Sequence, residues 1–266
     1  MLRMKDKIKI IFVDIDWTLL DHSNELHEYD YASIEALKEA QKKGVKVFLC
    51  TARNYDTVEQ TGLFKMFTPD GMALANGGLV YNGEEVIKEI VFSKEKFEKV
   101  CEVALENNLN IEAGERRHLF LIKEADKNVK ILYNVFIAEI PPVEDYHNRH
   151  IITVMLVATP EYDEKVKAAL PEGISYYRFC DYGVDIVEEE HNKGDAVRFV
   201  LDYLGIKKEE AMAFGDDDAD IDMFKEVGYP VSMGNAKSHV KPHSVYVTSN
   251  VWESGVKKGL IKFNVI

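Results

Sequence analysis

Two aspartates near the start of the chain, Asp14 and Asp16, are the first residues whose type and spacing suggest chemistry. They follow residues 8–13, an apolar run rich in β-branched and aromatic side chains, which predicts a strand buried on both faces of a parallel sheet. Residues two apart on a strand project the same way, toward the sheet edge where open α/β proteins bind ligands. Because neighbouring carboxylates oppose each other's ionisation, the pair indicates a bound cation or acid–base chemistry.

A second acidic segment begins at Asp216 and holds five aspartates in seven residues, and only Gly215 separates it from the apolar run 211–214. A solvated helix start is one interpretation, because the helix dipole favours carboxylates there. A standard EF-hand is excluded, since its sixth position is Ile221 instead of Gly and its twelfth is Val227 instead of Glu. Carboxylate oxygens in such number, again at the end of a strand, favour a Mg²⁺ site that also takes a substrate phosphate.

Lys193 is the third residue of interest, because it lies in the first turn of a predicted helix over 193–204. Asn192 can cap this helix and Gly205 can end it. A cation in the first turn is opposed by the helix dipole by about 0.3–1 kcal/mol. A surface lysine is the commoner explanation, and a cluster of aspartates with a phosphate is the alternative that supplies a partner.

The elements that must position these residues alternate between strands and helices. The sequence predicts strands over 8–13, 45–50 and 72–75, with helices before residue 44 and over 54–66, and later strands over 211–214, 229–233 and 245–248. Polar stretches follow two of the strands, Thr51-Ala52-Arg53 and Asn76-Gly77-Gly78. This order predicts an α/β fold, a Rossmann-like parallel-sheet core with helices on both faces and right-handed crossovers.

The central part of the chain has a different pattern. Residues 79–81 and 86–92 predict a hairpin on the Asn82-Gly83 turn, and the following hundred residues mix helices and strands without regular alternation. We therefore predict a discontinuous core over 1–81 and 188–266, with an α+β domain inserted over 82–187.

Composition limits the possible functions. The chain has 266 residues, 46% of them hydrophobic, and a net charge of −13, which argues against general binding to nucleic acids or anionic membranes. Cys50, Cys101 and Cys180 are too far apart for a metal-ligand motif and fit buried thiols in a reducing compartment, so we expect a cytoplasmic protein. The first apolar run is only six residues long, which predicts neither a signal peptide nor a membrane span.

Taken together, four segments resemble the haloacid dehalogenase superfamily of phosphotransferases. They read DIDWTL at 14–19, TAR at 51–53, HNKGDAV at 191–197 and GDDDADIDM at 215–223. Their order and the long insert are most similar to the Cof-type subgroup with a C2B cap, whose members mostly hydrolyse small phosphate esters. The resemblance implies a Mg²⁺-dependent phosphatase for a sugar phosphate or cofactor phosphate, with a small phosphate ester as its partner. We expect a monomer or weak homodimer.

The resemblance also implies roles for individual residues. Asp14 would attack phosphorus to form an aspartyl-phosphate, and Asp16 would protonate the leaving oxygen and then activate water. Lys193 would neutralise the phosphoryl group and orient Asp14. The remaining implied residues are Thr51, Ala52, Arg53, Asn76 and Gly77 for substrate, Asp216 with Asp14 and the Asp16 carbonyl for Mg²⁺, and Asp220 and Asp217 behind these ligands.

Two residues depart from the family pattern. Trp17 stands between Asp16 and Thr18, where Gly is common, and Ala219 precedes Asp220, where Asn is usual. Neither change removes a nucleophile, an acid or a main ligand, so we expect catalysis to be retained. Two alternatives stay open at this point, a phosphomutase that uses the same aspartyl-phosphate and a phosphometabolite-binding or regulatory module with vestigial activity.

Overall fold

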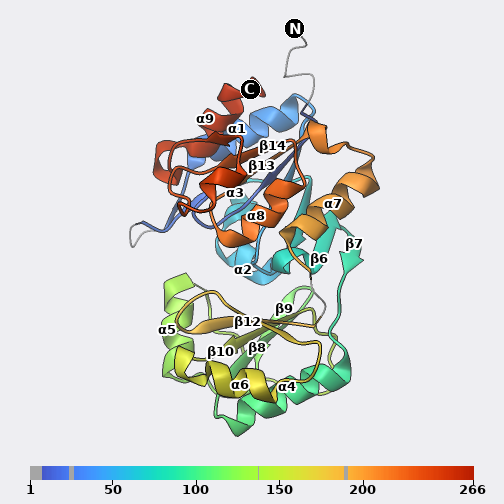
Figure 1. The fold of residues 1–266 in the computed structure, drawn as a ribbon, viewed down its shortest axis with the longest axis vertical. Coiled ribbons are helices and arrows are strands. Elements are labelled where there is room, and N and C mark those ends of the chain that lie inside the picture. Colours follow the sequence, from blue (N-terminus) through green and yellow to red (C-terminus); the bar gives the residue numbers. More distant parts are fainter. Residues whose placement is uncertain (1–7, 24–26, 137, 189–190) are drawn as a thin grey trace. The chain divides into compact units, whose positions relative to one another are not determined.

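The computed structural model describes residues 8–23, 27–136, 138–188 and 191–266. These residues form two compact units (Figure 1). One unit lies within 1–52, 65–88 and 191–266, and the other lies within 53–64 and 89–190. Compared with the division we expect from the sequence, residues 82–88 fall in the first unit, and residues 53–64 and residue 188 fall in the second.

The first unit is built on an eight-stranded sheet with the strand order β15-β14-β13-β1-β4-β5-β6-β7. In chain order the strands are β1 (Ile10–Val13), β4 (Lys46–Cys50), β5 (Gly71–Leu74), β6 (Leu79–Asn82), β7 (Glu85–Glu89), β13 (Ala211–Gly215), β14 (Tyr229–Ser232) and β15 (Tyr246–Val247). Strand β1 pairs in parallel with β4 and β13, and Val13 lies opposite both Leu49 and Phe214. The predicted α/β class with a parallel sheet is confirmed, and the predicted hairpin supplies the β6-β7 edge of this sheet.

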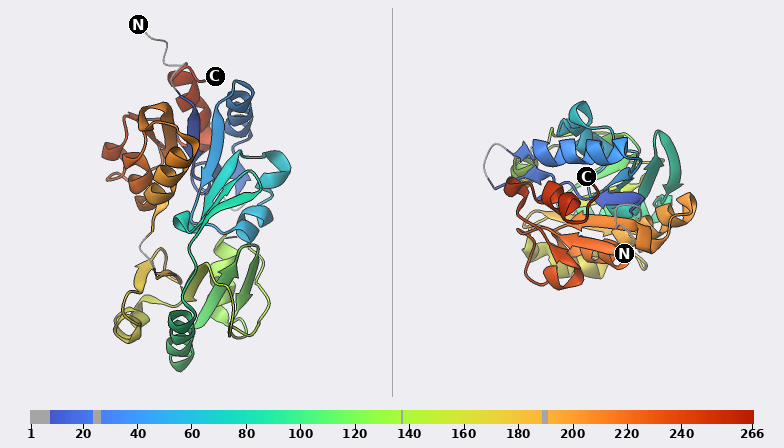
Figure 2. Two further views of the ribbon diagram at one scale, coloured as in Figure 1. Left: turned by 90° about the vertical axis from the view of Figure 1, so that its right-hand side faces the viewer. Right: turned by 90° about the horizontal axis from the view of Figure 1, so that it is seen from above.

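Helices cover both faces of this sheet (Figure 2). Helices α7 (Lys193–Leu204) and α8 (Asp218–Lys225) contact each other and bury one face. Helices α1 (Tyr31–Lys42) and α9 (Gly255–Lys262) contact each other on the opposite face. The central strands β1, β4, β5 and β13 are almost completely buried, because they are covered from two sides.

The second unit has a five-stranded sheet with the order β11-β12-β10-β8-β9 and antiparallel pairings. Its strands are β8 (Asn110–Glu115), β9 (His118–Leu121), β10 (Thr153–Val157), β11 (Ser175–Arg178) and β12 (Gly183–Val187), and its helices are α4 (Lys94–Glu106), α5 (Lys127–Phe136) and α6 (Asp163–Ala169). Helices α4 and α6 bury one face of the sheet, whereas α5 packs on Leu121 and Val157. This unit therefore has an apolar core of its own.

Two predicted segments differ locally from the structure. The helix expected over 54–66 is divided into α2 (Tyr55–Gln60) and α3 (Leu63–Met66), because Gly62 adopts a φ of +79°. Between β1 and α1 the structure has two short paired strands that we did not predict from the sequence, β2 (Leu20–Asp21) and β3 (Glu28–Tyr29). The 3₁₀ helices are η2 (Ala75–Gly77), η3 (Pro160–Tyr162), η4 (Lys208–Glu210), η5 (Lys241–His243) and η6 (Val251–Glu253). Among the helices of the described ranges, none has the length and apolar character that a membrane span requires.

Candidate active site

Lys193 contacts one carboxylate from each of the two acidic segments of the sequence. Its Nζ lies 2.9 Å from Oδ1 of Asp14, at the end of β1, and 2.7 Å from Oδ1 of Asp220, on α8. All three residues are buried, with at most 6% of any of them exposed. The structure thus brings Asp14, Lys193 and Asp220 into one ionic cluster, although they lie far apart in the sequence.

The start of α7 sets the position of Lys193. The helix begins at Lys193, as expected, and the side chain of Asn192 caps it by accepting from the Asp195 amide at 3.0 Å. Burial acts to lower the pKa of Lys193, but the Asp14 and Asp220 carboxylates raise it well above its ordinary value. The lysine therefore stays charged, and these carboxylates offset the unfavourable helix dipole.

The acidic segment divides into a buried half and an exposed half. Asp216 and Asp220 are buried, whereas Asp217 and Asp218 are exposed and form ion pairs with Lys237. Asp217 caps α8 and thus lies outside the cluster. The periodicity of α8 explains the division, because Asp220 faces back toward β13 one turn after the cap.

Asp220 is held from several directions. Its Oδ1 accepts from Lys193, and its Oδ2 accepts from the backbone N–H groups of Asp216 at 2.8 Å and Asp217 at 3.0 Å. A Cβ at Gly215 would overlap the Asp220 carboxyl group, so the close approach of this carboxylate to β13 requires glycine. Both oxygens of Asp220 are engaged within the protein, which makes it a support for Lys193 and the loop after β13.

The carboxylates of this cluster fit a divalent cation. Ligand oxygens of Asp14, Asp216 and Asp220 lie within 4.8 Å of one another. Burial, with the nearby Asp220 and Asp14 carboxylates, raises the pKa of Asp216, and burial also raises the pKa of Asp14 although Lys193 acts in the opposite direction. The raised pKa values mean that the negative charge of these carboxylates is not fully neutralised by the protein. Hard oxygen ligands of this kind suit Mg²⁺. Because Asp220 is engaged, Asp14 and Asp216 are the carboxylates best placed to hold it.

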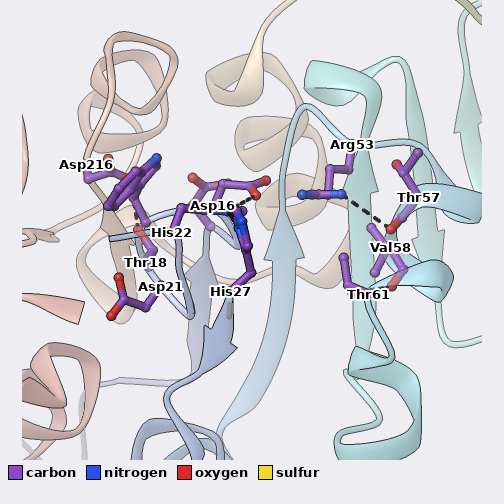
Figure 3. A network of polar contacts seen from close by, with 12 residues as sticks. Asp16, Thr18, Asp21, His22, His27, Arg53, Thr57, Val58, Thr61 and Asp216 are labelled. Carbon is purple, nitrogen blue, oxygen red and sulfur yellow. Dashed lines mark hydrogen bonds and ion pairs between the residues drawn. The ribbon is translucent and has the colours of Figure 1, made fainter. Parts of the chain in front are cut away.

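Asp16 does not belong to this group of three carboxylates. Its Oδ1 is 2.7 Å from Nε2 of His22, and its side chain is 28% exposed (Figure 3). The contact of its backbone carbonyl with a metal stays a prediction. The neighbouring Trp17 adopts a φ of +57°, the left-handed region that glycine would enter without strain.

The predicted phosphate contact Thr51 lies at the end of β4 and is 1% exposed. Its backbone N–H donates to the Ala73 carbonyl at 2.9 Å, and its carbonyl accepts from the Asn76 amide at 3.1 Å. The backbone therefore ties the loop after β4 to the loop after β5.

The remaining predicted substrate residues lie on these two loops. A Cβ on Gly77, whose φ is +93°, would come within 2.7 Å of the Asn192 carbonyl oxygen, so this loop packs closely on the start of α7. Ala52 is exposed, and Arg53 donates to the Thr57 carbonyl at 3.5 Å within the second unit (Figure 3). The structure thus places Asn76 and Gly77 in the same unit as Lys193, whereas Arg53 belongs to the other unit.

Three residues for which we predicted no role from the sequence also shape the site. Thr18 is completely buried and donates from Oγ1 to Oδ1 of Asp216 at 3.2 Å (Figure 3). Gly215 leaves room for Asp220, and His22 contacts Asp16. Thr18 and Gly215 belong to the two aspartate-rich motifs that carry the resemblance. Their positions beside the aspartates were the feature of the sequence that could have indicated a role in the site.

The family model of the haloacid dehalogenase-like hydrolases matches residues 11–260. The chain belongs to this family. It is 30% identical over 251 residues to phosphoglycolate phosphatase 1 of Saccharolobus solfataricus, covering 94% of this chain and 93% of that protein. It is 27% identical over 261 residues to the putative phosphatase YxeH of Bacillus subtilis, with 93% and 95% of the two chains covered.

Solved structures of haloacid dehalogenase-like proteins agree with this assignment. The subclass IIB sugar phosphatase BT4131 superposes with a TM-score of 0.82 and 27% identity, over 97% of this chain and 100% of that chain. The predicted membership of the superfamily and of its Cof-type, subclass IIB branch is confirmed. The predicted enzyme class is confirmed as well, and this haloacid dehalogenase-like hydrolase is a phosphoric monoester hydrolase.

Proposed function

We propose that this hydrolase is a Mg²⁺-dependent phosphatase that removes phosphate from a small phosphorylated metabolite through an aspartyl-phosphate on Asp14. One observation carries the proposal. Lys193 lies within 2.9 Å of Asp14 inside a buried acidic cluster, so a carboxylate and a cation meet where a phosphate would react. Neutralising the repulsion between an anionic nucleophile and an anionic ester is the main electrostatic task in phosphoryl transfer.

The proposed reaction has two displacements. In the first, a carboxylate oxygen of Asp14 bonds to phosphorus, the ester P–O bond breaks, and Asp16 gives its proton to the departing oxygen. In the second, Asp16 takes a proton from water, the water oxygen bonds to phosphorus, and the bond to Asp14 breaks to release phosphate. Asp16 changes protonation state between the two steps, which lets one group serve as acid and then as base.

Lys193 acts in both displacements by holding Asp14 and by donating toward the phosphoryl oxygens. Asp220 keeps the ammonium group in place, and Thr18 orients Asp216 through its hydroxyl. Mg²⁺, held by Asp14 and Asp216 with the Asp16 carbonyl, would supply positive charge beside the transferring phosphoryl group.

The relatives support a small substrate. The protein from S. solfataricus is named phosphoglycolate phosphatase 1, and BT4131 is described as a sugar phosphatase. We therefore propose phosphomonoesters of this size, phosphoglycolate and sugar phosphates first. Thr51 is proposed to hydrogen-bond the phosphoryl group. Ala52, Arg53, Asn76 and Gly77 are proposed to contact the substrate.

The test is phosphate release from a panel of phosphate esters with and without Mg²⁺. Wild type should hydrolyse members of the panel only with the metal, and Asp14→Asn should lose the activity. Asp217→Asn is the matched control, because Asp217 is an exposed aspartate outside the cluster, and it should keep the activity. An Asp14→Asn variant with full activity would refute the nucleophile, and transfer of phosphate to a sugar acceptor instead of water would favour a phosphomutase.

We also propose that the enzyme works in the cytoplasm as a monomer or weak homodimer, without nucleic-acid or membrane partners. The free thiols of Cys50, Cys101 and Cys180 support a reducing compartment. The net charge of −13 opposes binding to nucleic acids and anionic membranes. Sedimentation at several protein concentrations would test the oligomeric state.

A further inference from the structure

Two histidines lie beside the proposed acid and base, Asp16. Nε2 of His22 is 2.7 Å from Oδ1 of Asp16, and Nδ1 of His22 is 2.6 Å from Nδ1 of His27 (Figure 3). The His22 side chain is only 10% exposed. The three side chains form a hydrogen-bonded row that ends on the carboxylate.

The local backbone and one aromatic ring hold His22 in this position. Strands β2 and β3 pair Asp21 with Glu28. His22 directly follows β2 and His27 directly precedes β3, so this pairing brings the two histidines together. The Trp17 ring lies 5.4 Å from the His22 ring at an interplanar angle of 53°. The Trp17 carbonyl in turn accepts from Nδ2 of Asn235 at 2.8 Å, which fixes the turn that carries the tryptophan.

Hydrogen-bond chemistry determines how the protons are arranged in this row. Two imidazole nitrogens 2.6 Å apart require one proton between them, and an ionised carboxylate requires a donor. A neutral His22 meets both conditions when Nε2–H donates to Asp16 and Nδ1 accepts from His27 Nδ1–H. An ionised Asp16 therefore selects the tautomer of His22 with the proton on Nε2, and the contact with His27 is compatible with that tautomer.

We propose that His22 is a positioning residue that fixes the carboxylate of Asp16 for proton transfer. The hydrogen bond to Oδ1 sets the plane of the carboxyl group from which the proton goes to the leaving oxygen. This inference rests on the proposed function, in which Asp16 is the acid of the first displacement. Trp17, where the family commonly has Gly, gives the His22 ring a surface to pack against.

The role predicts a dependence on the leaving group. An alkyl phosphate expels a strongly basic alkoxide and needs a proton from Asp16, whereas p-nitrophenyl phosphate expels a stable phenolate and does not. A positioned acid contributes about 10²–10⁴-fold to such steps. Loss of positioning should therefore lower kcat/KM for alkyl esters much more than for the aryl ester, because kcat/KM reports steps up to the departure of the leaving group.

The experiment measures kcat/KM for one alkyl phosphate substrate and for p-nitrophenyl phosphate in wild type, His22→Leu and His22→Gln. For His22→Leu we expect the alkyl-to-aryl ratio to fall by about tenfold or more. His22→Gln keeps an N–H donor of similar reach and should restore most of the ratio. Thermal unfolding of each variant shows whether it is folded, and if His22→Leu does not fold, His22→Asn replaces it as the variant with a shorter reach.

Combining these variants with Asp16→Asn separates two kinds of failure. Asp16→Asn alone should lower the ratio, and adding His22→Leu should lower it no further, because His22 acts through Asp16. An unchanged ratio in Asp16→Asn would refute the acid role in the proposed function. A low ratio in Asp16→Asn with an equal loss for both substrates in His22→Leu would overturn the positioning role and leave only a structural one.

Discussion

The ammonium group of Lys193 lies 2.9 Å from Oδ1 of Asp14, and both side chains are almost completely buried. Lys193→Met removes this cation while keeping the length of the side chain. We expect kcat/KM to fall by about 10²–10³-fold, because a preorganised charge is lost where the phosphate reacts. Lys237→Met is the control, since its ion pairs with Asp217 and Asp218 are exposed and should matter little. Equal losses in the two variants would contradict a specific role for Lys193.

Thr18→Val tests how Asp216 is oriented. The substitution keeps the shape of the side chain but removes the hydroxyl that donates to Asp216 Oδ1 at 3.2 Å. Partners that orient metal ligands typically change affinity about 10–100-fold, so the Mg²⁺ concentration for half-maximal activity should rise by about tenfold. Thr18→Ser keeps the donor and should remain near wild type. A normal Mg²⁺ titration of Thr18→Val would show that Asp216 is held by other contacts.

Gly215→Ala should disturb the cluster without touching a charged group. The new methyl group would overlap the Asp220 carboxyl group and push it away from its two backbone donors and Lys193. We expect about 1–3 kcal/mol of destabilisation by overpacking, measured by urea unfolding, together with a lower kcat. Gly83→Ala introduces strain at a φ of +59° where the space is open, so it should lower stability slightly and leave activity unchanged. If both variants retain wild-type activity, Gly215 is not needed to place Asp220.

Glu112 predicts a pH dependence of stability in the second unit. It is buried and accepts from the Tyr133 hydroxyl, and burial raises its pKa from 4.5 to about 7. Between these values the folded state keeps a proton that the unfolded state releases, so stability should fall as pH rises through this window. The shift corresponds to about 3 kcal/mol, and Glu112→Gln should remove this loss because it does not ionise.

The measurement for Glu112 is urea unfolding at about pH 5 and pH 8. Glu112→Gln should be more stable than wild type at the higher pH, and its free energy of unfolding should not decline between the two pH values. Glu106→Gln removes a carboxylate from an exposed position on α4 and serves as the control. A steep decline that persists in Glu112→Gln would assign the pH dependence to another group.

The parts of the fold that the sequence predicted well are those with strong local patterns. The apolar run ending at Asp14 and the capped helix from Lys193 to Leu204 appear almost as expected, because burial and capping are both visible in residue order. The prediction of one continuous helix over 54–66 is wrong. The sequence pattern continues across Gly62, but the helical conformation of the backbone is interrupted there. Strands β2 and β3 are too short to show a period, so their pairing could not be read from the sequence.

The candidate site shows a similar limit. The sequence shows that aspartates are concentrated within residues 216–222. Only the orientation of α8 in the structure separates buried Asp220 from exposed Asp217. The contact between His22 and Asp16 joins side chains outside any periodic element, so no sequence pattern indicates it. Distances between charged groups are properties of the assembled sheet, whereas residue order indicates only that these groups meet at its edge.

The position of β1 between β4 and β13 has a consequence for how the chain is made on the ribosome. One edge of β1 can pair early with β4, but the other pairs only with β13, about 200 residues after β1. At about 5–20 residues per second, this edge waits roughly 10–40 s for its partner, with its backbone groups available to other strands. Much of the waiting time is spent synthesising the second unit, which has its own apolar core. We therefore expect the inserted unit to fold during translation before the sheet that carries Asp14 is complete.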